Sequence, residues 1–262
     1  RLRVVTRLCR PAIDMSRLAS IDVSPRSITR ADAFLMTDFR YEIWARQEAP
    51  GFEIALIRES LAATLTDLLR RLAIRRLGFE SPYVTYRQYQ RLTAAAVEAD
   101  LKVEWHPQDG LVESLRAVKS GEELEAIRQA LDLSEAVLVD VAGKLAPGVT
   151  ERALAWEIEK RLREAGSEGV AFPPIVAAGL NSARPHHQPG DYPIKKGEPI
   201  IIDMGARFNG YCADITRTYI LGEPSEMFRQ VYGLVRQAQS RAESRLKAGL
   251  DSRAADALGR EV

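Results

Sequence analysis

Cysteine and histidine are both scarce in this chain. Its 262 residues include two cysteines, Cys9 and Cys212, and three histidines, His106, His186 and His187. Two cysteines do not make a disulfide framework, whereas 262 residues are enough to bury one or two hydrophobic cores. The three histidines are the only imidazoles that could carry protons near neutral pH.

The chain also lacks a dominant charge and a long apolar run. Its 37 basic and 36 acidic residues give a formal net charge of +1, so bulk electrostatics do not point to nucleic acid or to an anionic membrane. No apolar run reaches the length of a transmembrane helix, and the basic N-terminus lacks the apolar segment of a signal peptide. We therefore expect a cytoplasmic protein with neither a nucleic acid nor a membrane as partner.

The composition is that of an ordinary globular protein, with 46% hydrophobic and 28% charged residues. From Ala33 onward, strand-like and helical segments alternate, which indicates a small α/β domain that ends near residue 110. The expected elements are strands at 33–37, 52–57 and 101–105 and helices at 59–77 and 86–99.

Two domains, 1–110 and 111–262, are expected. Residues 1–32 are an atypical part of the first, because they show no sustained period and contain several breakers. In the second, Ser120 and Glu123 form a capping box, and Thr150 caps a helix that Gly166 ends. The expected fold class is α/β.

The stretch IIDMGARFNGYCADITRTY predicts a β-hairpin. Its Asn-Gly pair, Asn209-Gly210, is typical of a type I′ turn, which requires positive φ at both central residues. That turn sets a register in which Asp203 faces Thr216 and Gly205 faces Asp214. Both aspartates then lie on the polar face, although aspartate is depleted in strands.

Two readings of this aspartate pair are open. Diagonal cross-strand neighbours lie about 7–8 Å apart, so the two carboxylates could bind one or two hard cations, with Gly205 leaving room opposite Asp214. Alternatively, the face is simply solvated and Asp214 forms a surface ion pair with Arg207 or Arg217.

The histidines also leave two readings. His186 and His187 lie in the turn-rich stretch NSARPHHQPGD, shortly before the hairpin. They could be exposed and idle, or one could act as a proton shuttle beside the aspartates. His106 is expected to be structural or exposed.

These residues resemble a known family. The stretches NSARPHH and IKKGEPIIIDMGARFNGYCADITRTY are similar to the signature of the Xaa-Pro aminopeptidase and prolidase family of M24 metallopeptidases, which have the pita-bread fold. Upstream, LRAVKSGEELEAIRQALDLSEAVL and LMTDFRYEIWARQEAPG are similar to its domain entry and to part of its smaller N-terminal domain. The resemblance covers residues 33–262, whereas residues 1–32 do not match the family's opening.

The resemblance implies a role for each site residue. Asp203 would bind one metal ion and Asp214 would bridge two, with Thr216 supporting Asp203 across the hairpin. His186 would contact the substrate near the scissile bond and assist proton transfer, and His187 would contribute to substrate binding.

The resemblance also implies the reaction and its cofactors. A hydroxide that bridges two divalent ions, Mn²⁺ or Co²⁺ with Zn²⁺ or Fe²⁺ as alternatives, would attack the peptide bond before a proline in second position. The expected activity is that of an Xaa-Pro aminopeptidase, and the expected assembly is a homodimer. The alternatives are a prolidase, which is an Xaa-Pro dipeptidase, a creatinase-like hydrolase without metal, and a non-catalytic pita-bread protein.

One departure from the family concerns the metal ligands. The family has three further ligands, a histidine and two glutamates, in a stretch that follows the helix beginning near Asp251. None of the three is expected within these 262 residues. We therefore expect an incomplete version of a longer enzyme, with a pita-bread domain that lacks its C-terminal part and is inactive as given.

Overall fold

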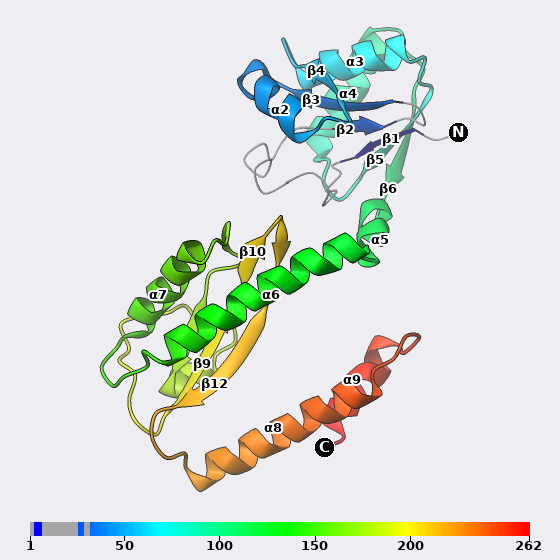
Figure 1. Cartoon of the computed structure of the whole chain (residues 1–262). Helices are drawn as coiled ribbons and strands as arrows, with labels where there is room; N and C mark the ends of the chain where they lie inside the picture. The colour runs from blue at the N-terminus through cyan, green and yellow to red at the C-terminus, as the bar shows by residue number, and fades with distance from the viewer. Residues whose placement is uncertain (1–2, 7–25, 29–31) are drawn as a thin grey trace. The chain divides into compact units, whose positions relative to one another are not determined.

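The computed structural model describes residues 3–6, 26–28 and 32–262 (Figure 1). The chain divides into two compact units. The N-terminal unit comprises Arg1–Gln129 with Phe208–Tyr211, and the C-terminal unit comprises Ala130–Arg207 with Cys212–Val262. Each unit has its own sheet and its own hydrophobic core.

The N-terminal unit is built on a six-stranded mixed sheet of order β4-β3-β2-β1-β5-β6. Strand β2 is antiparallel to both of its neighbours, and the other neighbouring pairs are parallel. The strands are β1 (Arg3–Thr6), β2 (Arg26–Ile28), β3 (Ala33–Thr37), β4 (Glu53–Leu56), β5 (Arg76–Glu80) and β6 (Glu104–Gln108). The helices are η2 (Phe39–Tyr41), α2 (Glu42–Glu48), α3 (Leu61–Arg71), α4 (Tyr86–Glu98) and α5 (Leu111–Ala117). The expected mixture of helices and strands is confirmed.

Two local predictions in this unit need correction. The helix expected at 59–77 ends at Arg71, and strand β5 occupies the end of that range. Ile74 and Leu77 belong to the unit's core. Their apolar spacing suggested that the helix continues, but Ile74 lies in the connection after α3 and Leu77 lies in strand β5. Strands β1 and β2 lie within the 1–32 segment, for which no element was expected. The rest of that segment, apart from Asp32, lies outside the described residues.

The C-terminal unit contains two small three-stranded sheets, of order β12-β9-β8 and β11-β10-β7. The strands are β7 (Gly169–Val170), β8 (Ile175–Ala178), β9 (Pro199–Met204), β10 (Ala206–Phe208), β11 (Tyr211–Cys212) and β12 (Ile215–Ile220). The helices are α6 (Gly121–Ala142), α7 (Glu151–Glu164), η3 (Gly179–Ala183), α8 (Glu226–Arg245) and α9 (Ser252–Arg260). The unit boundary falls within three of these elements, because Gly121–Gln129 of α6, Phe208 of β10 and Tyr211 of β11 belong to the N-terminal unit. Within the described residues, no helix has the length and apolar content that a membrane span requires.

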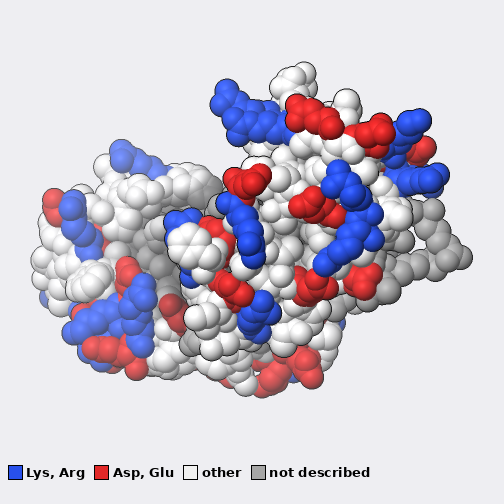
Figure 2. Space-filling model, turned by 90° about the horizontal axis from the view of Figure 1, so that it is seen from above, with Lys and Arg blue, Asp and Glu red and all other residues white. Residues whose placement is uncertain are grey.

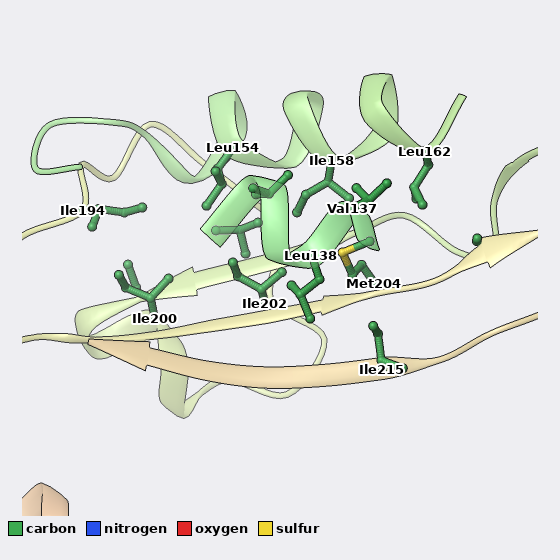
Figure 3. Packing of buried hydrophobic residues seen from close by; sticks show 14 residues of the cluster. Val137, Leu138, Leu154, Ile158, Leu162, Ile194, Ile200, Ile202, Met204 and Ile215 are labelled. Carbon is green, nitrogen blue, oxygen red and sulfur yellow. The ribbon is translucent and has the colours of Figure 1, made fainter. Parts of the chain in front are cut away.

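The core of the C-terminal unit lies between two helices and the sheet that contains β9 (Figure 3). Apolar side chains of α6 and α7 point toward apolar side chains of β9 and β12. The buried members include Val137, Leu138, Leu154, Ile158, Leu162, Ile200, Ile202, Met204 and Ile215. Because side chains alternate along the strands, Asp203 of β9 and Thr216 of β12 lie on the other face.

The predicted helix ends are confirmed. The backbone N–H of Glu123 donates to the Ser120 hydroxyl at 3.3 Å, and the Ser120 N–H donates to the Glu123 carboxylate at 2.5 Å. The Thr150 hydroxyl accepts from the Ala153 N–H at the start of α7. Gly166 follows α7 with φ +94°, the left-handed conformation that favours glycine after a helix.

Charges are mixed on the surface. On the face drawn in Figure 2, basic and acidic side chains are interspersed, in keeping with the net charge of +1. In this view, the described residues therefore form no large patch of a single sign.

Candidate active site

The hairpin that carries the two aspartates has the predicted turn and register. Asn209 and Gly210 have φ values of +48° and +77°, as a type I′ turn requires. Strands β9 and β12 are antiparallel, with Asp203 opposite Thr216. The local sequence therefore sets the relative placement of the polar side chains.

The two faces of the hairpin differ as the alternation predicts. Met204 and Ile215 are buried, whereas Asp203 is half-buried and Asp214 and Thr216 are exposed. Since the apolar face packs on α6 and α7, the carboxylates lie on the opposite face, where water or a ligand can reach them.

Gly205, between β9 and β10, has a different role from the predicted one. A Cβ at this position would lie 1.8 Å from the backbone oxygen of Ala213. The space beside the glycine is therefore filled by the neighbouring strand and is not left open for an ion opposite Asp214. Glycine is required here because the two backbones approach so closely.

Three side chains act on the carboxyl group of Asp203. Burial raises its pKa above the ordinary value, and the charge and hydrogen bonding of Asp214 raise it further. The Thr216 hydroxyl, which donates a hydrogen bond to Oδ1 of Asp203 at 2.8 Å, lowers that pKa, and so does the electrostatic interaction with His186. The structure thus places Asp203, Asp214 and Thr216 together, and His186 lies within electrostatic range of Asp203.

The alternative reading, in which an arginine neutralises Asp214, finds no support in the ion pairs. Arg207 pairs with Glu168 at 3.5 Å, and Arg217 pairs with Glu135 at 3.5 Å. In the part of the chain that the structure describes, neither arginine forms an ion pair with Asp214. The two carboxylates therefore lie near each other without a cationic side chain from these candidates.

The carboxylates of Asp203 and Asp214 have the chemistry of ligands for a divalent cation. Carboxylate oxygens are hard ligands that suit Mn²⁺ and Mg²⁺, and a cation would relieve the repulsion between the two carboxylates. Among the described residues, however, no group of three or more His, Cys, Asp or Glu side chains is placed to hold a metal ion. Asp203 and Asp214 can therefore provide only part of a coordination sphere.

The two adjacent histidines, His186 and His187, have different surroundings. His186 is exposed and has φ +56°, a left-handed conformation that is uncommon for a residue other than glycine. The side chain of His187 is 10% exposed, and its Nε2 lies 2.8 Å from Oε2 of Glu151. His186 is therefore accessible to solvent, whereas His187 is anchored inside the unit.

Glu151, the first residue of α7, was not predicted as a site residue. Its side chain is fully buried, which by itself would raise its pKa, but hydrogen bonds from Ala178, His187, Asn181 and Gly190 hold that pKa below the ordinary value. The sequence offered little signal, because an acidic residue in the first turn of a helix is common. Only its position directly after the capping residue could have drawn attention to it.

His106 is separate from this site. It lies in β6 of the N-terminal unit, where its Nε2 is 3.5 Å from a carboxylate oxygen of Glu104 and accepts a long hydrogen bond from Arg76. His106 was expected to be structural or exposed, and in the structure it is half-buried with these two long contacts.

Known proteins match both parts of the chain. The sequence model of metallopeptidase family M24 matches residues 125–262, and that of the creatinase/prolidase N-terminal domain matches residues 27–118. Among curated proteins, an uncharacterized peptidase of Bacillus subtilis (strain 168) is 36% identical over 229 residues. These residues make up 87% of this chain and 64% of that relative, so the chain spans less than two thirds of its length.

Two solved structures are similar over 99% of the chain. The Xaa-Pro dipeptidase from Bacillus anthracis has a TM-score of 0.87 and 33% identity, and the match covers 71% of that protein. The X-Pro aminopeptidase from Thermotoga maritima MSB8 has a TM-score of 0.86 and 31% identity, and the match covers 74% of it. With an M24 match over more than half of its residues and this likeness in fold, the chain belongs to metallopeptidase family M24 and has its pita-bread fold, preceded by a creatinase/prolidase N-terminal domain.

Proposed function

We propose that the protein hydrolyses the peptide bond before a proline in the second position of a peptide. One observation carries this proposal: Asp203, Asp214 and Thr216 lie on the exposed face of one hairpin, with the His186 imidazole within electrostatic range of Asp203. Two of the similar solved proteins, an Xaa-Pro dipeptidase and an X-Pro aminopeptidase, suggest the substrate class.

In this proposal, Asp203 and Asp214 hold divalent cations, for which we infer Mn²⁺ or Co²⁺. When bound, such cations act as Lewis acids on a carbonyl group and lower the pKa of a coordinated water molecule. Thr216 holds the Asp203 carboxylate in one orientation through its 2.8 Å hydrogen bond. That orientation restricts where a ligand of Asp203 can lie.

His186 is the proposed proton carrier. Its imidazole is exposed and near enough to Asp203 to influence that carboxyl group electrostatically. Imidazole titrates near neutral pH, so His186 can donate a proton to the leaving nitrogen of the scissile bond. We also propose that His187 contacts the substrate. Because its side chain is 10% exposed, only that exposed part of the ring can touch a substrate.

The length of the substrate separates two forms of the proposal. An aminopeptidase removes the first residue from Xaa-Pro-Yaa peptides, whereas a dipeptidase cleaves Xaa-Pro alone. The sequence motifs lead us to favour the aminopeptidase, whereas the likeness to the Bacillus anthracis Xaa-Pro dipeptidase favours the dipeptidase. We also propose a homodimer, which light scattering on the purified protein would test.

The test is an assay on a full-length form, in which the chain continues to the length of its Bacillus subtilis relative. The protein is incubated with Mn²⁺ and either Ala-Pro or Ala-Pro-Ala, with Ala-Ala-Ala as the control peptide. We expect release of alanine from one or both proline peptides and not from the control. Absence of release from both proline peptides, with Mn²⁺ bound, would contradict the proposal.

The 262-residue chain by itself is expected to bind Mn²⁺ weakly and to be inactive. Among the described residues, these two carboxylates belong to no group of three or more His, Cys, Asp or Glu side chains that is placed to hold a metal ion. Calorimetric titration of this chain with Mn²⁺ checks the expectation, and tight binding of two ions would contradict it.

A further inference from the structure

We propose that Glu151 is the positioning residue that holds the His186 loop in its active geometry. The proposal rests on the proposed function, in which His186 carries a proton, but its main test does not require activity. Glu151 lies at the start of α7, in a different element from the loop that it holds.

The carboxylate of Glu151 uses its full hydrogen-bonding capacity on one segment of the chain. Its Oε1 accepts from the Ala178 N–H at 2.8 Å and the Asn181 side chain at 3.0 Å. Its Oε2 accepts from the Gly190 N–H at 3.1 Å and lies 2.8 Å from Nε2 of His187. A carboxylate offers about four lone-pair sites, so Glu151 has none left for a metal ion or a substrate.

These bonds fix which ring nitrogen of His187 donates a hydrogen bond. Because the pKa of Glu151 is held low, its carboxylate is ionised and can only accept hydrogen bonds. Nε2 of His187 must then carry the proton and donate it to Oε2. The anchored ring is the residue directly after His186.

The partners of Glu151 bracket His186 on both sides. Ala178 and Asn181 precede it, and His187 and Gly190 follow it. A left-handed backbone at a residue other than glycine is strained and persists where the surrounding structure enforces it. With φ +56° at His186, the Glu151 anchor is the structure that enforces this conformation.

Imidazole NMR can test this role on the 262-residue chain, because it contains three histidines. His106, in the N-terminal unit, is an internal control. In the unchanged chain, we expect His187 to show a slowly exchanging proton on Nε2. In Glu151→Gln, the amide NH₂ replaces one acceptor oxygen, so we expect that proton to exchange rapidly and the His186 signals to shift, with His106 unchanged.

Thr150→Ala is the matched structural control. It removes the capping hydrogen bond at the same end of α7 but touches none of the loop's bonds to Glu151. We expect it to lower the melting temperature while leaving the signals of all three histidines in place. If it shifts His186 as much as Glu151→Gln does, the effect is general destabilisation and the proposal is wrong.

A second variant keeps the test decisive if Glu151→Gln fails to fold. His187→Gln keeps a donor group but removes the ring, and we expect it to shift the His186 signals in the same direction. Unchanged His186 signals in the folded variants would overturn the proposal.

Kinetics on the full-length form with Mn²⁺ add a second readout. Misplacing a catalytic group by about 1 Å can cost about 10²-fold in rate, so we expect Glu151→Gln to lower kcat by about 10- to 100-fold with KM within about threefold. An unchanged kcat would overturn the role of Glu151. Absence of Xaa-Pro hydrolysis in the unchanged protein would instead contradict the proposed function. In that case, the NMR result alone decides whether Glu151 positions the His186 loop.

Discussion

The hairpin and the His186 loop hold their polar groups in different ways. In the hairpin, the backbone ladder of β9 and β12 and a buried apolar face fix Asp203 and Asp214. The His186 loop, between η3 and β9, is held instead by one buried carboxylate, Glu151. Damage to the hairpin should therefore reduce the stability of the whole unit, whereas damage to the loop should act locally.

The largest expected effect is that of Gly205→Ala, in the hairpin. Its Cβ would lie 1.8 Å from the backbone oxygen of Ala213, and a backbone atom cannot yield as a side chain can. Overpacking typically costs about 1–3 kcal/mol and occasionally more, and we expect at least the upper end of that range here. Urea denaturation of the 262-residue chain measures the loss.

Gly233→Ala is the control for this substitution. Gly233 lies in α8 with nothing within 4 Å of its would-be Cβ, so alanine should stabilise the helix by about 0.4–1 kcal/mol. Equal effects of the two substitutions would contradict the argument from close backbone approach.

Ser134→Ala should have the next largest effect on the hairpin. The fully buried Ser134 hydroxyl accepts from the Ala206 N–H at 2.8 Å, just where the chain passes from β9 to β10. Its removal leaves a buried N–H without its partner, which costs about 1–3 kcal/mol. The free energy of unfolding measures this loss, and a change below about 0.5 kcal/mol would show that another group takes the place of the hydroxyl.

In the loop, Asn181→Ala should have a smaller effect. It removes one of the hydrogen bonds to Glu151, and Oε1 of Glu151 keeps its bond from Ala178. A single hydrogen bond contributes about 0.5–1.5 kcal/mol. We expect faster amide hydrogen exchange in the loop with little change in the exchange of β9 amides. If amide hydrogen exchange became faster to the same extent in the loop and in β9, the proposed difference between loop and hairpin would be wrong.

The smallest effect is expected at Glu157, on α7 away from both regions. Lys144 and Arg161 hold its pKa at about 2, below the ordinary value of 4.5. Its contribution to stability is therefore present above about pH 4.5 and is lost as the pH falls toward 2. Glu157→Gln should flatten the pH dependence of stability in that window alone, and an identical pH profile for both proteins would contradict this assignment.

The contrast between the two regions also explains what could be predicted from the sequence. The hairpin register followed from Asn209-Gly210 and from the alternation of apolar residues, which are local signals. The role of Gly205 was missed because the Ala213 carbonyl comes from the opposite strand.

The loop depends on contacts that are distant in sequence. The partners of Glu151 lie 27 to 39 positions along the chain, and no local pattern connects them. The first two residues of strand β5, Arg76 and Leu77, were assigned to a helix for a similar reason, because parallel pairing with β1 and β6, and not their own spacing, defines the strand. The roles proposed for His186, His187 and Thr216 remain predictions.

The central claim is that Asp203 and Asp214 hold the metal ions of an Xaa-Pro peptidase. The most direct measurement is Mn²⁺ titration of the full-length form and of its Asp214→Asn variant, together with hydrolysis of proline peptides. We expect Mn²⁺ binding to weaken and hydrolysis to fall by at least about 10²-fold in the variant, because one carboxylate of the pair is lost. Unchanged Mn²⁺ affinity and unchanged hydrolysis in Asp214→Asn would contradict the claim.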